Sequence, residues 1–119
     1  MKEHKLGKAG PPAFDIGFHP AAEKEFFALP EQVQARFEKA IDQLEVDPFK
    51  QRSGLDVLKL ADLSDGSTLH RLRVGERRAC YAIVTSDKRV WILLFDDREV
   101  GYKRMQGAAE RRFKSLGTK

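Results

Sequence analysis

Hydrophobic and polar positions alternate between residues 68 and 95 in a way that predicts three consecutive antiparallel strands. In the first strand, residues 68–74, period-two alternation places Leu69, Arg71 and Arg73 on one face. A tight turn at Gly75-Glu76 leads to the second strand, residues 77–85, which is rich in β-forming residues. The third, residues 90–95, is a continuous apolar run, as expected for a central strand covered on both faces.

Two amphipathic helices are predicted ahead of this sheet. Pro20 stands in a first-turn position that tolerates proline, and Pro30 ends the first helix and begins the second. Apolar residues then recur at helical spacing through about Val46. The two helices form an α-hairpin whose apolar side must cover a sheet face, and the expected partners are Trp91, Leu93 and Phe95, or their alternates.

Three shorter patterns complete the predicted fold. Residues 14–18 read as a short strand beside the later sheet, and residues 56–60 as a weaker strand ahead of the other three. Residues 102–116 form a basic, amphipathic C-terminal helix. The order predicts an α+β fold with an N-terminal strand, an α-hairpin, an antiparallel four-stranded meander and a C-terminal helix, with the helices on one face of the sheet.

Length and composition favour one domain with a separate N-terminal arm. Residues 1–13, with three lysines, two glycines and a proline pair, cannot bury enough apolar surface to order themselves. We therefore expect a flexible basic arm followed by a single domain over residues 14–119. The single cysteine excludes an internal disulfide, and with no signal peptide or membrane span in the pattern the expected compartment is the cytoplasm.

Charge is divided unevenly along the chain. Residues 14–67 carry 6 Lys/Arg against 11 Asp/Glu (6 − 11 = −5), residues 68–119 carry 13 against 6 (13 − 6 = +7), and residues 1–13 add +2 to the net charge of +4. The predicted sheet and the C-terminus therefore form a basic half, which suits contact with nucleic-acid phosphates. A solvated basic face is the alternative.

The usual catalytic motifs are missing from the sequence. The three histidines are dispersed, Cys80 stands alone, and no pair of ligands has the spacing of a zinc site. No glycine-rich phosphate loop follows a strand. The Asp96-Asp97 pair is more typical of a turn cap than of a metal site. We therefore expect neither a metal nor a cofactor.

Arginines on the predicted sheet are the remaining chemical signal. Arg71 and Arg73 are two residues apart, hence about 7 Å apart on one face. Arg78 follows just across the turn, and Arg98 lies at the exit of the last strand. The four are either solvated strand charges or a phosphodiester site, because the planar guanidinium binds phosphate bidentately and stabilises the extra charge of a pentacovalent phosphorus.

Three segments together resemble the RelE/ParE toxin superfamily of bacterial and archaeal toxin–antitoxin systems. They are residues 18–30, beginning Phe-His-Pro-Ala-Ala-Glu; residues 69–81, Leu-His-Arg-Leu-Arg-Val-Gly-Glu-Arg-Arg-Ala-Cys-Tyr; and residues 97–100, Asp-Arg-Glu-Val. The resemblance covers roughly residues 14–104. RelE-like members are ribosome-dependent, metal-independent mRNA endoribonucleases, known as mRNA interferases, which block translation. ParE-like members inhibit DNA gyrase instead. The arginine set favours the RelE-like branch.

The resemblance implies roles for individual residues. Arg71, Arg78 and Arg98 match catalytic basic positions of the RelE-like site, with Arg78 as the phosphate-stabilising arginine and Arg98 as an aid to proton transfer. Leu69 departs from the pattern, because it stands at a second basic position and cannot take part in proton transfer. Arginine is too basic to act as a general base, so Arg71 is expected to act by its charge. The residues expected to bind substrate are Arg73, Arg77, Tyr102, Lys103 and Arg104.

The implied partners follow from the same resemblance. They are mRNA, the ribosome and a small cognate antitoxin, whose apolar segment would cover the helix hairpin and whose acidic residues would neutralise the arginines. A non-enzymatic gyrase inhibitor and a degenerate member that only binds its antitoxin are the alternatives. His70, turned away from Arg71 by strand alternation, is expected to serve packing.

Overall fold

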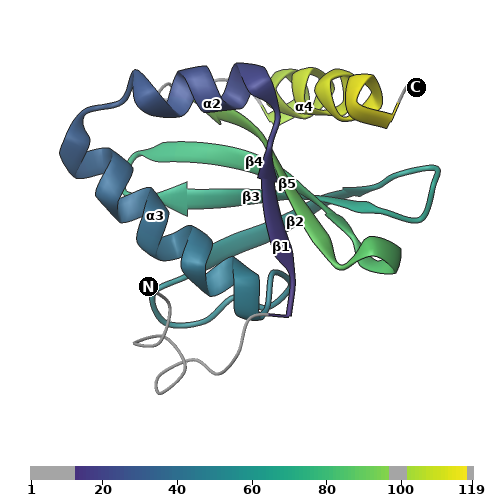
Figure 1. The fold of residues 1–119 in the computed structure, drawn as a ribbon, viewed down its shortest axis with the longest axis horizontal. Coiled ribbons are helices and arrows are strands. Elements are labelled where there is room, and N and C mark those ends of the chain that lie inside the picture. The colour runs from purple at the N-terminus through teal and green to yellow at the C-terminus, as the bar shows by residue number, and fades with distance from the viewer. Residues whose placement is uncertain (1–12, 97–101, 118–119) are drawn as a thin grey trace.

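A five-stranded sheet forms the centre of the computed structural model, which describes residues 13–96 and 102–117. The strand order is β1-β5-β4-β3-β2 (Figure 1). Strands β2 to β5 form the predicted antiparallel meander, and β1 pairs in parallel with β5. The bounds are Asp15–Phe18 for β1, Asp56–Asp62 for β2, Thr68–Val74 for β3, Arg77–Val84 for β4 and Arg89–Asp96 for β5.

The two helices of the predicted hairpin cover one face of the sheet. Helix α2 spans Pro20–Phe27 and helix α3 spans Glu31–Val46. The ring of His19 caps α2, since its Nδ1 accepts the backbone N–H of Ala21 at 2.9 Å. The apolar stripes of both helices pack on the sheet in a first core that includes Phe26, Phe37, Leu44, Leu72, Tyr81 and Ile92.

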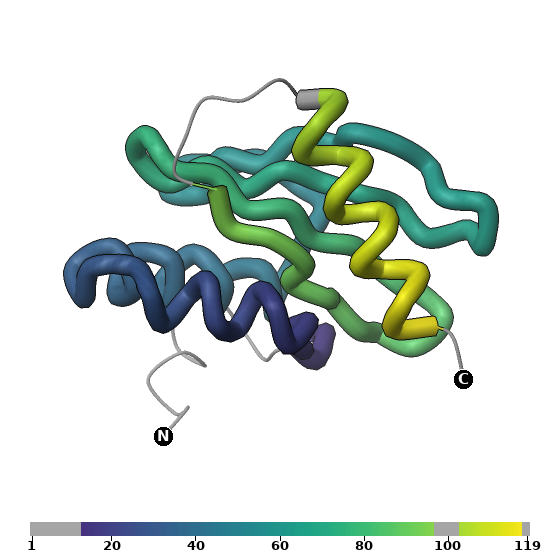
Figure 2. Tube along the Cα trace, turned by 90° about the horizontal axis from the view of Figure 1, so that it is seen from above, coloured from purple at the N-terminus to yellow at the C-terminus, as the bar shows by residue number. Residues whose placement is uncertain are grey.

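Helix α4, Tyr102–Gly117, covers the opposite face and corrects the expectation that all helices share one face. Figure 2 shows α4, in yellow, crossing the strands apart from the α2–α3 pair. The physical reason lies in β4, whose central residues are buried on both faces, so that one helix layer is not enough. The second core contains Leu69, Cys80, Ala82, Leu93, Leu94, Met105 and Ala109.

An irregularity in β5 changes which of its side chains face the hairpin. Cys80 pairs with Leu94 and Tyr81 with Ile92, so Leu93 is an extra residue in β5. Leu93 and Leu94 therefore both pack in the α4-side core, and Phe95 returns to the hairpin side. The sequence left open whether Trp91, Leu93 and Phe95 or their alternates meet the hairpin. The alternates Val90 and Ile92 do so, joined by Phe95, whereas Trp91 and Leu93 lie on the α4 side.

Two glycines make the turns that flank β3. Gly66 between β2 and β3 has φ +91°, and Gly75 between β3 and β4 has φ +62°. Residues with a Cβ rarely adopt such values, so both turns depend on glycine. Residues 1–12 of the expected basic arm lie outside the described residues. In the described part, no helix is long and apolar enough to cross a membrane.

Candidate functional site

Three of the predicted arginines lie at one end of the sheet, on its α4 side. In the β3–β4 register Arg73 stands opposite Arg78, and Arg71 stands opposite Cys80. Leu69 and Cys80, which share this face, belong to the α4-side core. Period-two alternation therefore places the three arginines on the same face of neighbouring strands. We call Arg71, Arg73 and Arg78 the arginine cluster.

Burial differs within the arginine cluster. Arg71 is 6% exposed and Arg78 is 8% exposed, whereas Arg73 is exposed. Burying a guanidinium is costly unless an acceptor compensates for the lost hydration. Arg71 has such an acceptor, because its Nη2 donates to Oδ1 of Asp56 at 2.7 Å. Sequence reasoning missed Asp56, whose position beside Arg71 follows only from the β2–β3 register.

A second aspartate borders the cluster from the other flank. Asp96 at the end of β5 stands opposite Arg78. Three arginines against two aspartates leave an excess of one positive charge (3 − 2 = +1) among these described residues. The acidic neighbours reduce repulsion between the guanidinium groups, and the remaining charge suits an anionic ligand.

Of the other predicted site residues, the structure describes the side chains of Arg77, Lys103 and Arg104. Arg77 lies on the hairpin side of β4 and lines a small pocket with Val33, Arg36 and Gly75. Lys103 and Arg104 are exposed in the first turn of α4. Arg98 and the side chain of Tyr102 lie outside the described part of the chain.

Burial moves the pKa values of Cys80 and His70 away from neutrality. Burial raises the pKa of the Cys80 thiol to about 12, so it stays protonated. Burial also lowers the pKa of His70 to about 4. The His70 ring lies on the hairpin side and stacks on Tyr81, with 5.2 Å between the ring centroids. This contact agrees with the packing role expected for His70. Leu69 is fully buried.

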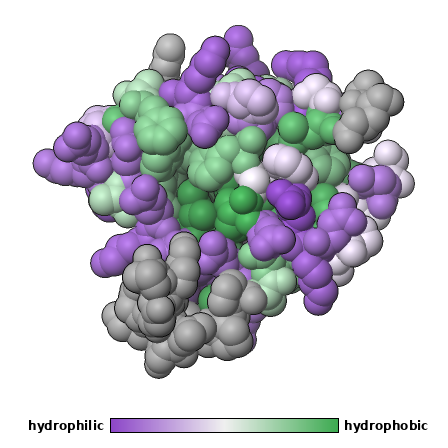
Figure 3. Space-filling model, in the orientation of Figure 1, coloured by the Kyte–Doolittle hydropathy of each residue, from purple (hydrophilic) through white to green (hydrophobic). Residues whose placement is uncertain are grey.

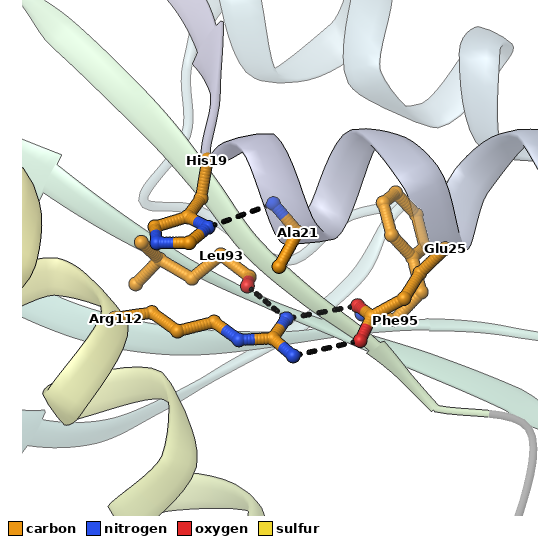
Figure 4. A network of polar contacts seen from close by, with 6 residues as sticks. All are labelled: His19, Ala21, Glu25, Leu93, Phe95 and Arg112. Atoms are coloured by element: carbon orange, nitrogen blue, oxygen red, sulfur yellow. Dashed lines mark hydrogen bonds and ion pairs between the residues drawn. The ribbon is translucent and has the colours of Figure 1, made fainter.

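A polar network ties α4 to α2 across β5 (Figure 4). The pairing of β1 with β5 ends at Phe18 and Ile92, so two backbone groups further along β5 need other partners. The Nη1 of Arg112 donates to the carbonyl oxygen of Leu93 at 2.9 Å, and the N–H of Phe95 donates to Glu25 Oε1 at 3.0 Å. Arg112 Nη2 and Glu25 Oε2 close the network at 2.8 Å.

Solved structures with this fold are bacterial and archaeal toxins. The RelE–RelB complex of Pyrococcus horikoshii OT3 contains a chain that is 29% identical, with a TM-score of 0.66 over 75% of this chain and 99% of that chain. A mutant of E. coli toxin RelE in the free state is 20% identical, with a TM-score of 0.62 over 84% and 97%. The toxin–antitoxin complex RelBE2 of Mycobacterium tuberculosis gives 23% identity and 0.53 over 74% and 100%.

No protein-family model and no curated protein matches the sequence. The structural matches, by contrast, span nearly the full length of each toxin. The fold, together with the 29% identity to a chain of the Pyrococcus horikoshii RelE–RelB complex, places the chain in the RelE-like toxin superfamily.

Proposed function

We propose that this chain is the toxin of a type II toxin–antitoxin system and cleaves mRNA on the ribosome without a metal ion. The observation that carries the proposal is the arginine cluster, which sets two buried guanidinium groups beside an exposed one on a single face. The structural matches to RelE toxins support the toxin assignment. Cleavage of mRNA and action on the ribosome come from the family resemblance.

The chemistry is an internal phosphoryl transfer within the RNA strand. The ribose 2′-oxygen attacks the adjacent phosphorus, the bond from phosphorus to the 5′-oxygen breaks, and a 2′,3′-cyclic phosphate forms. The proton of the 2′-OH is lost, and a proton reaches the departing 5′-oxygen. The role we assign to Arg78 and Arg71 is to stabilise the extra negative charge on the pentacovalent phosphorus, while Arg73 binds a neighbouring phosphate.

Proton transfer is the part of the reaction that the described residues do not supply. Cys80 and His70 have pKa values far from neutrality, and the side chain of Leu69 has no titratable group. We assign assistance at the leaving oxygen to Arg98, and acceptance of the 2′-OH proton to a group of the ribosome. This assignment accounts for a ribonuclease that is active only on its ribosomal substrate.

The same proposal includes a cognate antitoxin in the cytoplasm. Two of the matched structures are complexes of a RelE-family toxin with its antitoxin. A second surface of this chain suits such a partner: a cavity of about 400 Å3 between α2 and α3, lined by Phe18, Phe26, Phe27 and Ile41. Figure 3 shows the face of the molecule that carries α2 and α3, with apolar side chains gathered near its middle among hydrophilic ones.

A gyrase inhibitor is the second candidate, and the buried Leu69 favours it. An apolar residue at that position removes one basic group from the RelE-like set. In this case the arginines would serve binding rather than catalysis. Expression would then produce DNA breaks and a DNA-damage response, with the transcripts intact.

Mapping of transcript 5′ ends after brief induction in cells without the antitoxin tests the proposal. We expect cuts within translated codons for the wild type and for Lys24→Ala, which removes an exposed charge from α2 outside the arginine cluster. The cuts should vanish with Arg78→Ala, provided that the purified variant keeps a cooperative thermal transition. Intact transcripts with arrested growth would reject the ribonuclease in favour of a gyrase inhibitor. Intact transcripts with normal growth would leave only an antitoxin-binding member.

A further inference from the structure

A groove of about 640 Å3 runs beside the arginine cluster at the β2 edge of the sheet. Helix α3 forms one wall, and the segment from Gln51 to Asp56 forms the other. We infer that this groove binds the phosphodiester backbone of a single RNA strand whose adjacent nucleotide occupies the arginine cluster. The inference rests on the proposed ribonuclease function. It extends the proposed RNA-binding surface from the arginine cluster on the α4 side of the sheet to the groove on the α3 side.

Charge is the first argument for this ligand. Four cationic side chains line the groove, Arg36, Lys39, Arg52 and Arg73, and the carboxylate of Asp56 is the one acidic group among its described lining residues (4 − 1 = +3). That carboxylate is already bonded to Arg71. A positive groove attracts phosphates and favours their binding by the release of counterions.

Two other hollows on the described surface have the opposite character. The cavity between α2 and α3 carries Glu23, Glu38 and Asp42 on its rim. The hollow beside the C-terminal end of α4 is lined by Asp62, Asp65 and Glu110, with Lys114 as its cation. A polyanion is therefore attracted to the groove and repelled from these two hollows, so the groove is more than one part of a uniformly basic surface.

The cationic groups of the groove are arranged to accept phosphates. The Arg52 guanidinium donates to the carbonyl oxygens of Gln43, Asp47 and Lys50, which fix its position without neutralising its charge. Arg36 and Lys39 are exposed and three residues apart on α3, so they project from the same side of the helix. A fixed cation on one wall and two exposed cations on the other suit consecutive phosphates of a strand that lies between them.

Continuity with the arginine cluster is the second argument. Arg73 lines the groove and stands opposite Arg78 in the β3–β4 register. Asp56 lines the groove and holds Arg71 at 2.7 Å. The two surfaces therefore share residues at one end of the sheet. A strand that leaves the cluster past Arg73 would reach the groove by passing round the edge of the sheet at Asp56, which pairs with Arg73.

Fluorescence anisotropy with a labelled single-stranded oligoribonucleotide of about 12 nucleotides tests the inference. Titrations of the wild type, Arg36→Ala and Lys39→Ala are compared between about 50 and 200 mM salt. Each groove variant should bind about three- to tenfold more weakly and lower the salt slope by about 0.7. The matched control is Lys24→Ala, which removes one exposed charge from α2 outside the groove and should bind like the wild type.

Two results would overturn the inference. Wild-type affinity in both groove variants would show that RNA does not enter the groove, and equal weakening by Lys24→Ala would show only diffuse attraction. The same titration with poly-glutamate covers the alternative ligand. Loss of poly-glutamate binding with unchanged RNA binding would assign the groove to an acidic protein segment instead.

Cleavage on purified ribosomes programmed with an mRNA separates this inference from the proposed function. If the wild type cleaves, the groove variants should need about three- to tenfold more ribosomes for half-maximal cleavage, and an unchanged requirement would count against the groove. If the wild type does not cleave, the ribonuclease proposal fails. The anisotropy result then decides on the groove alone.

Discussion

Asp56 links the two surfaces proposed to bind RNA, and its removal should affect them in opposite directions. Asp56→Ala deletes the acceptor of Arg71 and should slow single-turnover cleavage by about tenfold, because a misplaced guanidinium stabilises the transition state poorly. The same change removes the carboxylate from the groove, so RNA affinity should stay equal or increase. Rates and affinities measured on one preparation check both directions.

Asp56→Asn is the control for this prediction. Its amide oxygen still accepts a hydrogen bond from Arg71, so cleavage should recover in part while the negative charge remains absent. If both variants lost cleavage and RNA affinity together, Asp56 would support the fold rather than position Arg71.

His70 gives the stability of the fold a specific dependence on pH. Burial lowers its pKa from 6.5 to about 4, so between these values the unfolded chain binds more protons than the folded chain. The contribution is present above pH 6.5 and is lost as the pH falls towards 4. After allowance for solvent screening, we expect the free energy of unfolding to fall by about 1 kcal/mol between pH 7.5 and 5.5.

Urea unfolding of the wild type and of His70→Gln at both pH values measures this term. The loss should shrink more in His70→Gln than in His19→Gln, because burial also lowers the pKa of His19 but leaves its ring, which caps α2, half-exposed. An identical pH dependence in His70→Gln and the wild type would mean that His70 is protonated equally well in the folded and unfolded chains.

At the scale of elements, the Arg112–Glu25 ion pair adds to the apolar contacts that hold α4 over the sheet. Arg112→Ala removes the bond to Glu25 and leaves the carbonyl oxygen of Leu93 and the carboxylate of Glu25 without this donor. The expected cost is about 1–3 kcal/mol of unfolding free energy, with faster hydrogen exchange in α4. The neighbouring Arg111→Ala removes an exposed charge from the same helix turn and should have little effect. Equal loss in both variants would argue against the network.

The elements themselves follow largely from the sequence, and the contacts between them do not. Period-two alternation was sufficient to place Arg71, Arg73 and Arg78 on one face, because each strand of the pair obeys it locally. The partner of Arg71 depends on the register of β2, which its weak pattern does not encode. The extra residue Leu93 in β5 is likewise set by pairing and changes the face of Phe95.

The side of the sheet taken by α4 is another contact that the sequence pattern left undetermined. An amphipathic helix needs an apolar face, but its pattern does not distinguish between the two apolar faces of one sheet. Here the hairpin comes first in the chain and covers one face, so Met105 and Ala109 pack on the other. The Glu25–Arg112 pair, 87 residues apart in sequence, then joins the layers.

At the scale of the whole molecule, surfaces of opposite charge set requirements for the proposed antitoxin. The arginine cluster and the groove are positive, whereas the cavity between α2 and α3 combines apolar walls with Glu23, Glu38 and Asp42. An antitoxin that covers both surfaces must carry an acidic segment for the arginine cluster and the groove. It must also carry a segment with apolar and basic side chains for the cavity between α2 and α3.

Phe27 offers a test of that requirement, because its side chain is 66% exposed and lines the cavity between α2 and α3. Phe27→Ala removes apolar contact area without opening the core, so folding and mRNA cleavage should persist. Binding to the proposed antitoxin should weaken by about 10- to 100-fold, since exposed aromatic anchors carry much of the energy of an interface. Titration calorimetry gives the affinity, and Phe49→Ala, which removes a ring that is 48% exposed outside the cavity, is the control. Unchanged affinity in Phe27→Ala would exclude the cavity from the interface and leave the arginine surface as the antitoxin's target.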